Sequence, residues 1–207
     1  MATASHLGIK GLEGLHSVTI RQKVTGFSNN KYVVLAPDGA VILYAKENSG
    51  ALNRLFGGKD RAFEINIYDT QDKEVVRLRR PYTFGPDKMD VTLCGSLISV
   101  VRQEVTFFKP VLNINDANDR PMLRVKGPMA TAGDADFKLY NTKKQQVGVI
   151  AKRWGGLARE LFSDADHFEI SFPADATVGV KAAIIGTCFL IMLSTSRSAS
   201  LLTLPSV

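Results

Sequence analysis

Residues 163–193 read SDADHFEISFPADATVGVKAAIIGTCFLIML, and the fold depends on how this stretch is interpreted. An acidic segment opens it, a short run of alternating apolar and polar residues follows, and the most apolar run of the chain closes it. Two structures fit this order. One is a cation-binding segment joined to a membrane helix, and the other is a final β-strand followed by a helix buried in its own domain.

The length of the apolar run favours the buried helix. Ala182–Leu193 contains twelve uncharged residues, which as a helix would cover roughly 18 Å against about 30 Å of bilayer hydrocarbon. A helix that is apolar on all sides must still be enclosed, and the interior of a β-barrel would enclose it. A membrane-inserted helix is the alternative. Either structure would use Lys181, Ala182, Ile184, Ile185, Cys188, Phe189, Leu190 and Ile191.

The acidic segment also has two interpretations. Its residues alternate between apolar and polar from 167 to 172, which is typical of a half-buried strand, and we expect a strand here. The alternative is a weak calcium site, because aspartates occupy positions 1, 3 and 12 of a twelve-residue window. Glu169 stands where calcium loops require glycine, and three positions would offer only backbone carbonyls. The candidate ligands are Asp164, Asp166, Phe168, Ile170, Phe172 and Asp175.

The rest of the chain is dominated by short alternating strands with turn residues between them. Residues 31–45, 63–78, 110–125 and 136–150 each predict a β-hairpin, and the first two hairpins recur in the last two as an internal repeat. Residues 89–105 add two more strand-like runs. With at least ten strands joined by hairpins, we expect an antiparallel sheet closed into a barrel around the apolar helix, since closure removes exposed edges.

Composition places the chain among ordinary globular proteins. It has 207 residues, 45% hydrophobic and 22% charged, enough for a substantial core. We expect one barrel domain at 15–193, a flexible N-terminus at 1–14 and a tail at 194–207. The two cysteines predict reduced thiols rather than a disulfide framework, and the N-terminus has no apolar signal segment. Motifs for covalent catalysis, nucleotide phosphate binding or zinc are absent from the sequence, so we expect neither an enzyme nor a small-molecule substrate.

The net charge of +6 suits an anionic partner, either a phospholipid surface or nucleic acid. Three basic clusters stand out. They are solvated strand ends and turns in one interpretation, and an anionic-lipid surface in the other, where each basic residue near the membrane contributes about 1 kcal/mol. The clusters comprise Arg77, Arg79 and Arg80, then Lys143 and Lys144, and finally Lys152 and Arg153.

Several motifs together resemble the phospholipid scramblase family. They are VTGFSNNKY (24–32), RPYTF (80–84), GDADF (133–137), GVIAKRWGG (148–156), ELFSDADHFEISFPAD (160–175) and VKAAIIGTCFLI (180–191). The resemblance covers roughly residues 15–192. It implies a fold related to tubby C-terminal domains, a twelve-stranded barrel around a central hydrophobic helix.

The resemblance also implies a function: calcium-responsive movement of phospholipids between plasma-membrane leaflets, in both directions and without ATP. Within the family, the proposed calcium loop corresponds to the six candidate ligands above, and the membrane segment to Lys181–Leu193. A segment matching Gly148–Leu157 implies links to nuclear import and DNA binding. The chain departs from the family pattern at Glu169, in its Ser- and Leu-containing tail, and in lacking a Pro-rich N-terminal region and a cysteine cluster near residues 82–89.

We therefore expect a calcium-responsive phospholipid scramblase at the cytosolic face of the plasma membrane, with anionic phospholipids as partners and Ca²⁺ as its cofactor. The alternative is a peripheral lipid-binding barrel or a nuclear adaptor that does not scramble lipid. In that case a cytosolic or nuclear pool and a nucleic-acid partner are expected.

Overall fold

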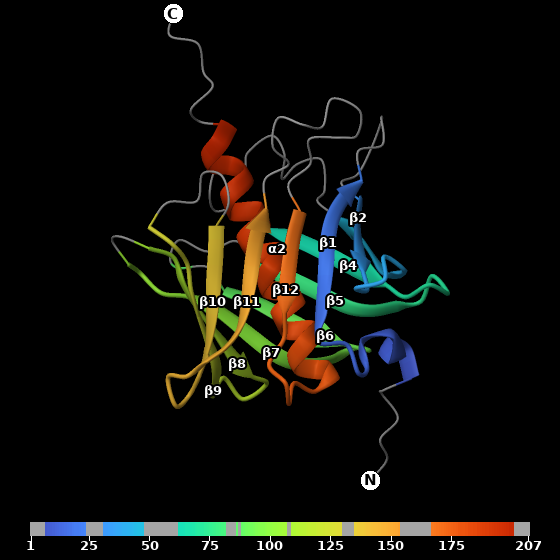
Figure 1. Ribbon diagram of the computed structural model, residues 1–207, viewed down its shortest axis with the longest axis horizontal. Coiled ribbons are helices and arrows are strands. Elements are labelled where there is room, and N and C mark those ends of the chain that lie inside the picture. The colour runs from blue at the N-terminus through green and yellow to red at the C-terminus, as the bar shows by residue number, and fades with distance from the viewer. Residues whose placement is uncertain are drawn as a thin grey trace, which may run out of the picture.

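The computed structural model describes residues 7–23, 31–47, 62–81, 86, 88–106, 109–129, 135–153 and 167–200. Within these residues the chain forms a short 3-10 helix, twelve strands and one long α-helix (Figure 1). In chain order they are η1 (Leu7–Leu12), β1 (Ser17–Lys23), β2 (Lys31–Leu35), β3 (Val41–Glu47), β4 (Phe63–Tyr68), β5 (Glu74–Arg80), β6 (Lys88–Leu93), β7 (Ser96–Gln103), β8 (Val111–Asp116), β9 (Pro121–Lys126), β10 (Ala135–Asn141), β11 (Gln146–Arg153), β12 (His167–Ser171) and α2 (Val178–Ser200).

The twelve described strands form a closed antiparallel barrel in the order β1-β12-β11-β10-β9-β8-β7-β6-β5-β4-β3-β2. Pairing of the first strand with the last closes it, and Val18 lies opposite Ile170 across that seam. Consecutive strands pair throughout, as expected for strands joined by hairpins. The predicted fold class, a closed β-barrel with a C-terminal helix, is therefore confirmed.

Four hairpin turns share one backbone geometry. In each, the N–H of the first turn residue donates to the carbonyl of the fifth, and the N–H of the fourth donates to the carbonyl of the first. The fourth residue has a positive φ, and the strand after the turn carries the extra residue of a β-bulge. These turns span residues 36–40, 69–73, 116–120 and 141–145.

The side chains that open these turns explain why the hairpins recur. Asp69, Asp116 and Asn141 each use a side-chain oxygen to accept a backbone N–H from within their own turn. In the first hairpin the equivalent residue is Ala36, and Gly39 takes the left-handed position at φ 85°. The turns of the first two hairpins therefore share their geometry with those of the last two, in agreement with the predicted internal repeat.

Alternating strand directions give the barrel two different ends. The five tight turns, which include Cys94-Gly95 between β6 and β7, gather at one end, here named the turn end. The longer connections lie at the other, the loop end. The helix α2 starts at the turn end, runs through the barrel and ends beyond the loop end (Figure 1).

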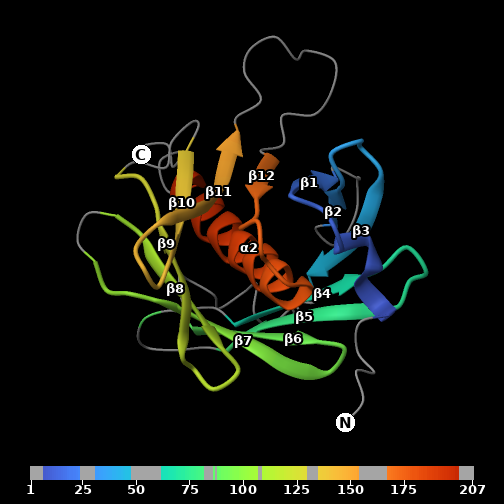
Figure 2. The ribbon, with the colours of Figure 1, turned by 60° about the horizontal axis from the view of Figure 1, so that its bottom comes forward.

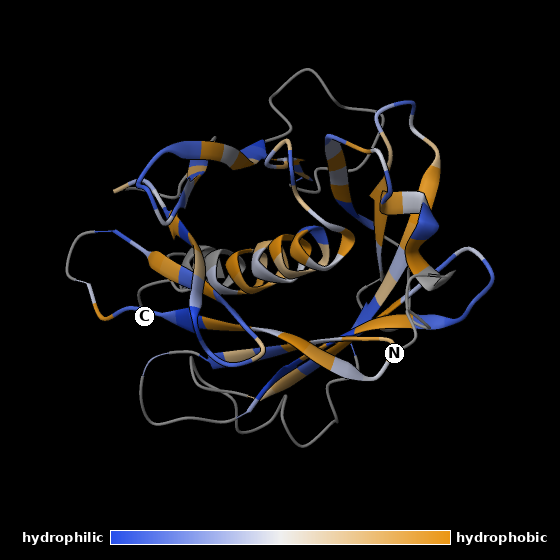
Figure 3. Ribbon diagram, turned by 90° about the horizontal axis from the view of Figure 1, so that it is seen from below, coloured by the Kyte–Doolittle hydropathy of each residue, from blue (hydrophilic) through white to orange (hydrophobic). Residues whose placement is uncertain are grey.

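The core of the molecule is the space between α2 and the inner wall of the barrel. Figures 2 and 3 show the helix surrounded by strands, and the hydropathy colouring of Figure 3 marks much of the helix as hydrophobic. From Ala182 to Leu193 every side chain is buried, and Phe189 packs edge to face on Tyr32 of β2 at 5.2 Å between ring centroids. The predicted core position of this helix is confirmed.

The helix α2 lies close to the barrel wall at Gly186. A Cβ atom added there would lie 2.8 Å from Leu78 Cδ2 on β5 and 3.3 Å from Val91 Cγ2 on β6. Glycine in a helix interior costs about 1 kcal/mol relative to alanine. The close packing against the wall explains why glycine occupies position 186 despite this cost.

The N-terminal residues complete the turn end. Residues 7–12 form η1, where Ile9 and Leu12 are 2% and 0% exposed, and Lys181 Nζ donates to the carbonyl of Leu12 at 2.9 Å. The N-terminal segment 1–14, expected to be flexible, thus contains a short 3-10 helix with two buried side chains. Ile9 and Leu12, three positions apart, bury their side chains and so cover the turn end of the barrel beside the start of α2. At the other limit, α2 continues to Ser200, into the expected tail.

We predict that replacing Gly186 with valine destabilises the domain by about 1–3 kcal/mol, because the added methyl groups would enter space already filled by Leu78 and Val91. The urea midpoint of unfolding measures this loss. Gly179 is the matched control, since its nearest neighbour would be 3.9 Å from an added Cβ. Alanine there should be neutral or stabilise by up to about 1 kcal/mol. An equal loss in both variants would contradict close packing at Gly186.

Candidate functional site

The helix predicted either to fill the barrel or to enter a membrane lies inside the barrel. Cys188 and Phe189 are 0% exposed, and burial raises the pKa of the Cys188 thiol far above its usual range. Lys181 is 7% exposed and lies with its Nζ 5.7 Å from the centre of the Phe172 ring. Among the described residues, no helix combines the length and apolarity needed to cross a bilayer.

The structure describes only part of the acidic segment, from His167 onward. Asp164 and Asp166 lie outside the described residues, so their prediction as calcium ligands stays a prediction. Phe168 and Ile170 lie in β12, with side chains 1% and 0% exposed. Because β12 pairs with β1 on one side and β11 on the other, its backbone carbonyls are directed at those strands. These two residues have the half-buried strand structure that alternation predicted.

The last two candidate ligands lie past β12, at the turn end. Phe172 is buried, and its N–H donates to the carbonyl of His16 at 2.9 Å. Asp175 is exposed in the turn before α2. A five-residue strand spans about 17 Å, whereas calcium ligands lie about 2.4 Å from the ion, so Asp175 cannot share an ion with groups at the loop end of β12. Within the described residues, no group of three or more His, Cys, Asp or Glu side chains could hold a metal ion.

The predicted basic clusters do not form one surface. The strands β5 and β11, which carry the first and last clusters, stand on opposite sides of the barrel in the strand order. Lys143 and Lys144 lie at the turn end, in the turn between β10 and β11, whereas the cationic ends of β5 and β11 lie at the loop end. A single membrane plane in contact with one end of the barrel would therefore reach only part of the predicted set.

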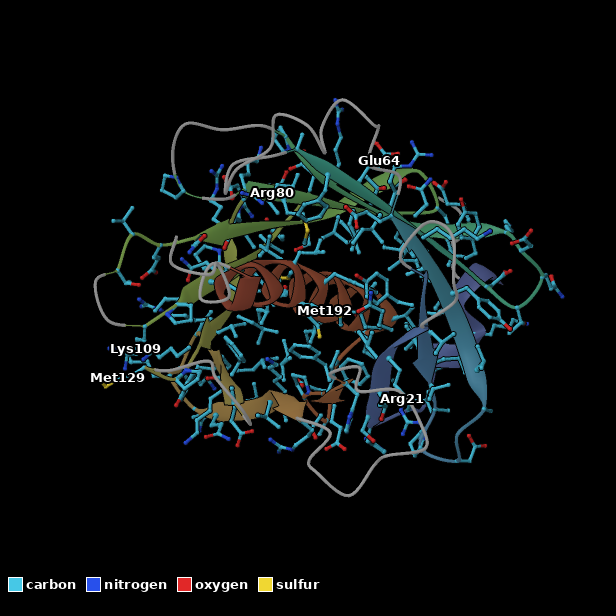
Figure 4. All side chains as sticks on the ribbon, turned by 90° about the horizontal axis from the view of Figure 1, so that it is seen from above. Arg21, Glu64, Arg80, Lys109, Met129 and Met192 are labelled. Carbon is cyan, nitrogen blue, oxygen red and sulfur yellow. The ribbon has the colours of Figure 1, made fainter. Side chains whose placement is uncertain are left out.

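Burial also separates members of the same cluster. Arg80 is 4% exposed, faces inward at the loop end and holds its guanidinium 5.7 Å from the centre of the Phe63 ring (Figure 4). Lys152 is 8% exposed and shares the inward face of β11 with Ile150. The exposed Arg77 forms an ion pair with Glu74 at 2.8 Å, so part of its charge is already neutralised. Arg79 is exposed on the outer face of β5.

A second basic surface, of which the sequence indicated only Arg153, lies on the outside of β9, β10 and β11 at the loop end. Here a groove of about 510 Å³ is lined by cationic side chains and one carboxylate. Its charged and aromatic members, which define the basic groove, are Lys109, Lys126, Asp136, Lys138, Tyr140 and Arg153. Strand register reveals it, because Lys126 and Lys138 lie twelve residues apart in sequence but directly opposite each other across β9 and β10.

One ion pair, between Arg102 and Asp119, shifts the pKa values of its two members and lies outside both the predicted basic clusters and the basic groove. Arg102 donates to Asp119 in the turn between β8 and β9, with 2.5 Å between Nη2 and Oδ2, and this hydrogen bond lowers the pKa of Asp119 to about 2. The same bond raises the pKa of Arg102. Because the pKa of Asp119 is depressed in the folded state, its contribution to stability is present above its ordinary pKa and is lost as the pH falls toward 2.

Comparison with known proteins places the whole barrel in one family. A family model described as Scramblase matches residues 11–194, which include every described strand and most of α2. The chain belongs to the scramblase family. The match begins within η1 and covers only its last two residues, Gly11 and Leu12.

The scramblase relatives are of moderate similarity. Phospholipid scramblase family member 5 of Homo sapiens is 32% identical over 88% of this chain and 74% of the relative. Phospholipid scramblase 1 of Homo sapiens is 32% identical over 89% of this chain, which spans 64% of that relative, and phospholipid scramblase 2 of Bos taurus is 32% identical over 89% and 69%. No solved structure matches the chain.

We predict that Cys188 is protected from thiol reagents in the folded protein, because it is fully buried and its raised pKa suppresses the reactive thiolate. A maleimide should label only Cys94, which is exposed, and should label both cysteines in urea. Mass spectrometry reports the modified residue. In a Cys94→Ser background native labelling should be close to zero. Rapid labelling of Cys188 without denaturant would show that α2 leaves the barrel readily.

Proposed function

We propose that this chain is a phospholipid scramblase that moves phospholipids between the leaflets of the plasma membrane, in both directions, without ATP and in response to calcium. The observation that carries the proposal is the family match over residues 11–194, which includes the barrel and the helix inside it. The names of the relatives describe phospholipid scramblases, and their similarity covers nearly nine tenths of this chain.

The packing of the barrel supports a lipid route on its outer surface. The interior is occupied by α2, with side chains such as Ile184 and Phe189 in contact with the wall. A phospholipid headgroup must be kept out of about 30 Å of hydrocarbon while it crosses, so charged groups at the barrel surface are the natural contacts for it. Cationic side chains at the loop end would also attract the anionic cytosolic leaflet.

Reconstitution tests the activity directly. The full chain in liposomes that carry a fluorescent lipid in both leaflets should allow dithionite, added outside with calcium and no ATP, to bleach nearly all the fluorescence. Bleaching that stops at the outer leaflet, with correct insertion or binding verified by flotation, would contradict scrambling. Liposomes without protein give the baseline.

The calcium response has a separate test. We predict that Asp164→Asn combined with Asp166→Asn abolishes it, because these side chains supply the carboxylates of the proposed site. Asp175→Asn should leave it unchanged, since Asp175 lies beyond β12 at the turn end. The measurement is the calcium dependence of the bleaching rate. A response that survives the double substitution, or is lost with Asp175→Asn alone, would refute this assignment.

A peripheral lipid-binding barrel is the second candidate function. The enclosure of α2 favours it, because the apolar helix already has a complete set of protein contacts and needs no membrane. This candidate predicts vesicle binding without dithionite access to the inner leaflet, and release from membranes by carbonate. Nuclear adaptor activity and nucleic-acid binding would instead require retention on duplex DNA at physiological salt.

A further inference from the structure

The basic groove contains an arrangement that folding alone does not favour. Lys126 on β9 and Lys138 on β10 are direct cross-strand partners, and like charges at such positions destabilise a sheet. Lys126 lies over the Tyr140 ring, with 4.9 Å between Nζ and the ring centre, and Lys138 is exposed. An anion bound between the two lysines on the outer face would offset their repulsion.

The groove has few carboxylates to supply that anion. Asp136 forms an ion pair with Arg153 at 2.7 Å. Nearby, Glu104 accepts from Arg124 at 2.6 Å and from Asn113 at 2.8 Å. Within the described part of the chain, Lys109, Lys126 and Lys138 form no ion pair, so the groove carries an excess of positive charge.

The backbone holds the groove in shape. The Gly127 N–H donates to the Pro110 carbonyl at 2.8 Å, which joins the start of β8 to the end of β9 and sets Lys109 near Lys126. A Cβ at Gly127 would lie 2.5 Å from Pro110 Cγ and 2.8 Å from Phe137 Cε1, so the two segments are in close contact. A volume of about 510 Å³ falls in the range of small-ligand sites.

Exposed apolar side chains beside the lysines identify the source of the anion. Met129 follows Gly127 closely and is 78% exposed, and it lies next to Lys109 at the edge of the loop end in Figure 4. Val105, on the neighbouring β7–β8 connection, is also 78% exposed. Exposed apolar side chains beside cationic ones are typical of surfaces that bind at the headgroup layer of a membrane. A soluble phosphate would gain nothing from them.

We propose that the basic groove binds the phosphate of an anionic phospholipid headgroup, with Met129 entering the boundary between headgroups and acyl chains. Lys109, Lys126 and Lys138 contact the phosphate, and Arg153 stays fixed by Asp136 at the side of the site. This site orients the loop end toward the membrane. The inference rests on the proposed function only in taking phospholipid as the partner, and it does not require that lipid be moved.

The test compares two double variants of the full chain by sedimentation with phosphatidylcholine vesicles that contain phosphatidylserine. Lys109→Gln with Lys138→Gln removes two groove charges, and the partition coefficient should fall about 30-fold. Lys10→Gln with Lys73→Gln removes the same charge from exposed positions at the turn end and should change binding by less than about twofold. All four lysines are exposed, so thermal unfolding of both variants should match that of the parent.

Three further results decide the identity of the ligand. Met129→Ser should weaken vesicle binding without changing its dependence on salt. If inorganic phosphate displaces the vesicles and Met129→Ser has no effect, the site is for soluble phosphate and the proposal fails. It also fails if the groove variant binds vesicles normally, or if its loss appears only with duplex DNA.

The outcome separates this inference from the proposed function. If the parent chain binds vesicles through the groove but dithionite never reaches the inner leaflet, the groove stands and scrambling is refuted. If the groove variant scrambles and binds as the parent does, scrambling stands and the groove is refuted.

Discussion

An α-helix with apolar side chains on every face has no stable position at a protein surface, and α2 imposes this constraint on the whole chain. Its enclosure needs a wall on all sides, which an open sheet cannot supply. The closed barrel supplies it through inward residues that alternate along each strand, such as Ile65 and Ile67 on β4. The contact at Gly186 then fixes how near the helix lies to β5 and β6. Closure of the barrel and burial of the helix therefore depend on each other.

The same constraint divides the molecule into two functional ends. At the turn end, tight hairpins and η1 close the barrel, and Lys181 joins the helix to that cap through the Leu12 carbonyl. At the loop end, cationic and exposed apolar side chains gather on one outer edge of the barrel. We expect ligand contact where cationic side chains have no ion pair and apolar side chains are exposed. Both occur at the loop end.

Local patterns predicted most of the fold, because period-2 alternation and turn residues act over a few residues. The hairpins that start at Asp69 and Asn141 are examples, since the turn side chain that predicts the hairpin also makes its hydrogen bonds. The candidate site was less predictable. Clusters in sequence suggested one basic surface, but Arg80 and Lys152 face inward, and Lys143 lies at the opposite end. The groove depends on register between β9 and β10, which a single sequence does not specify.

The resemblance to scramblases assigns the helix to a membrane, and the structure assigns it to the barrel core. These two positions exclude each other energetically. Moving α2 into lipid would leave the inner wall, including Ile20, Ile65 and Leu78, exposed to water. Each such side chain contributes about 1.5–3 kcal/mol when buried, so losing even six of them would cost roughly 10 kcal/mol or more, comparable with the whole stability of a domain. Insertion of the helix would thus require the barrel to unfold or to bind lipid in its place. If the folded barrel moves or binds lipid as proposed, its outer surface is the part that remains accessible to the lipid.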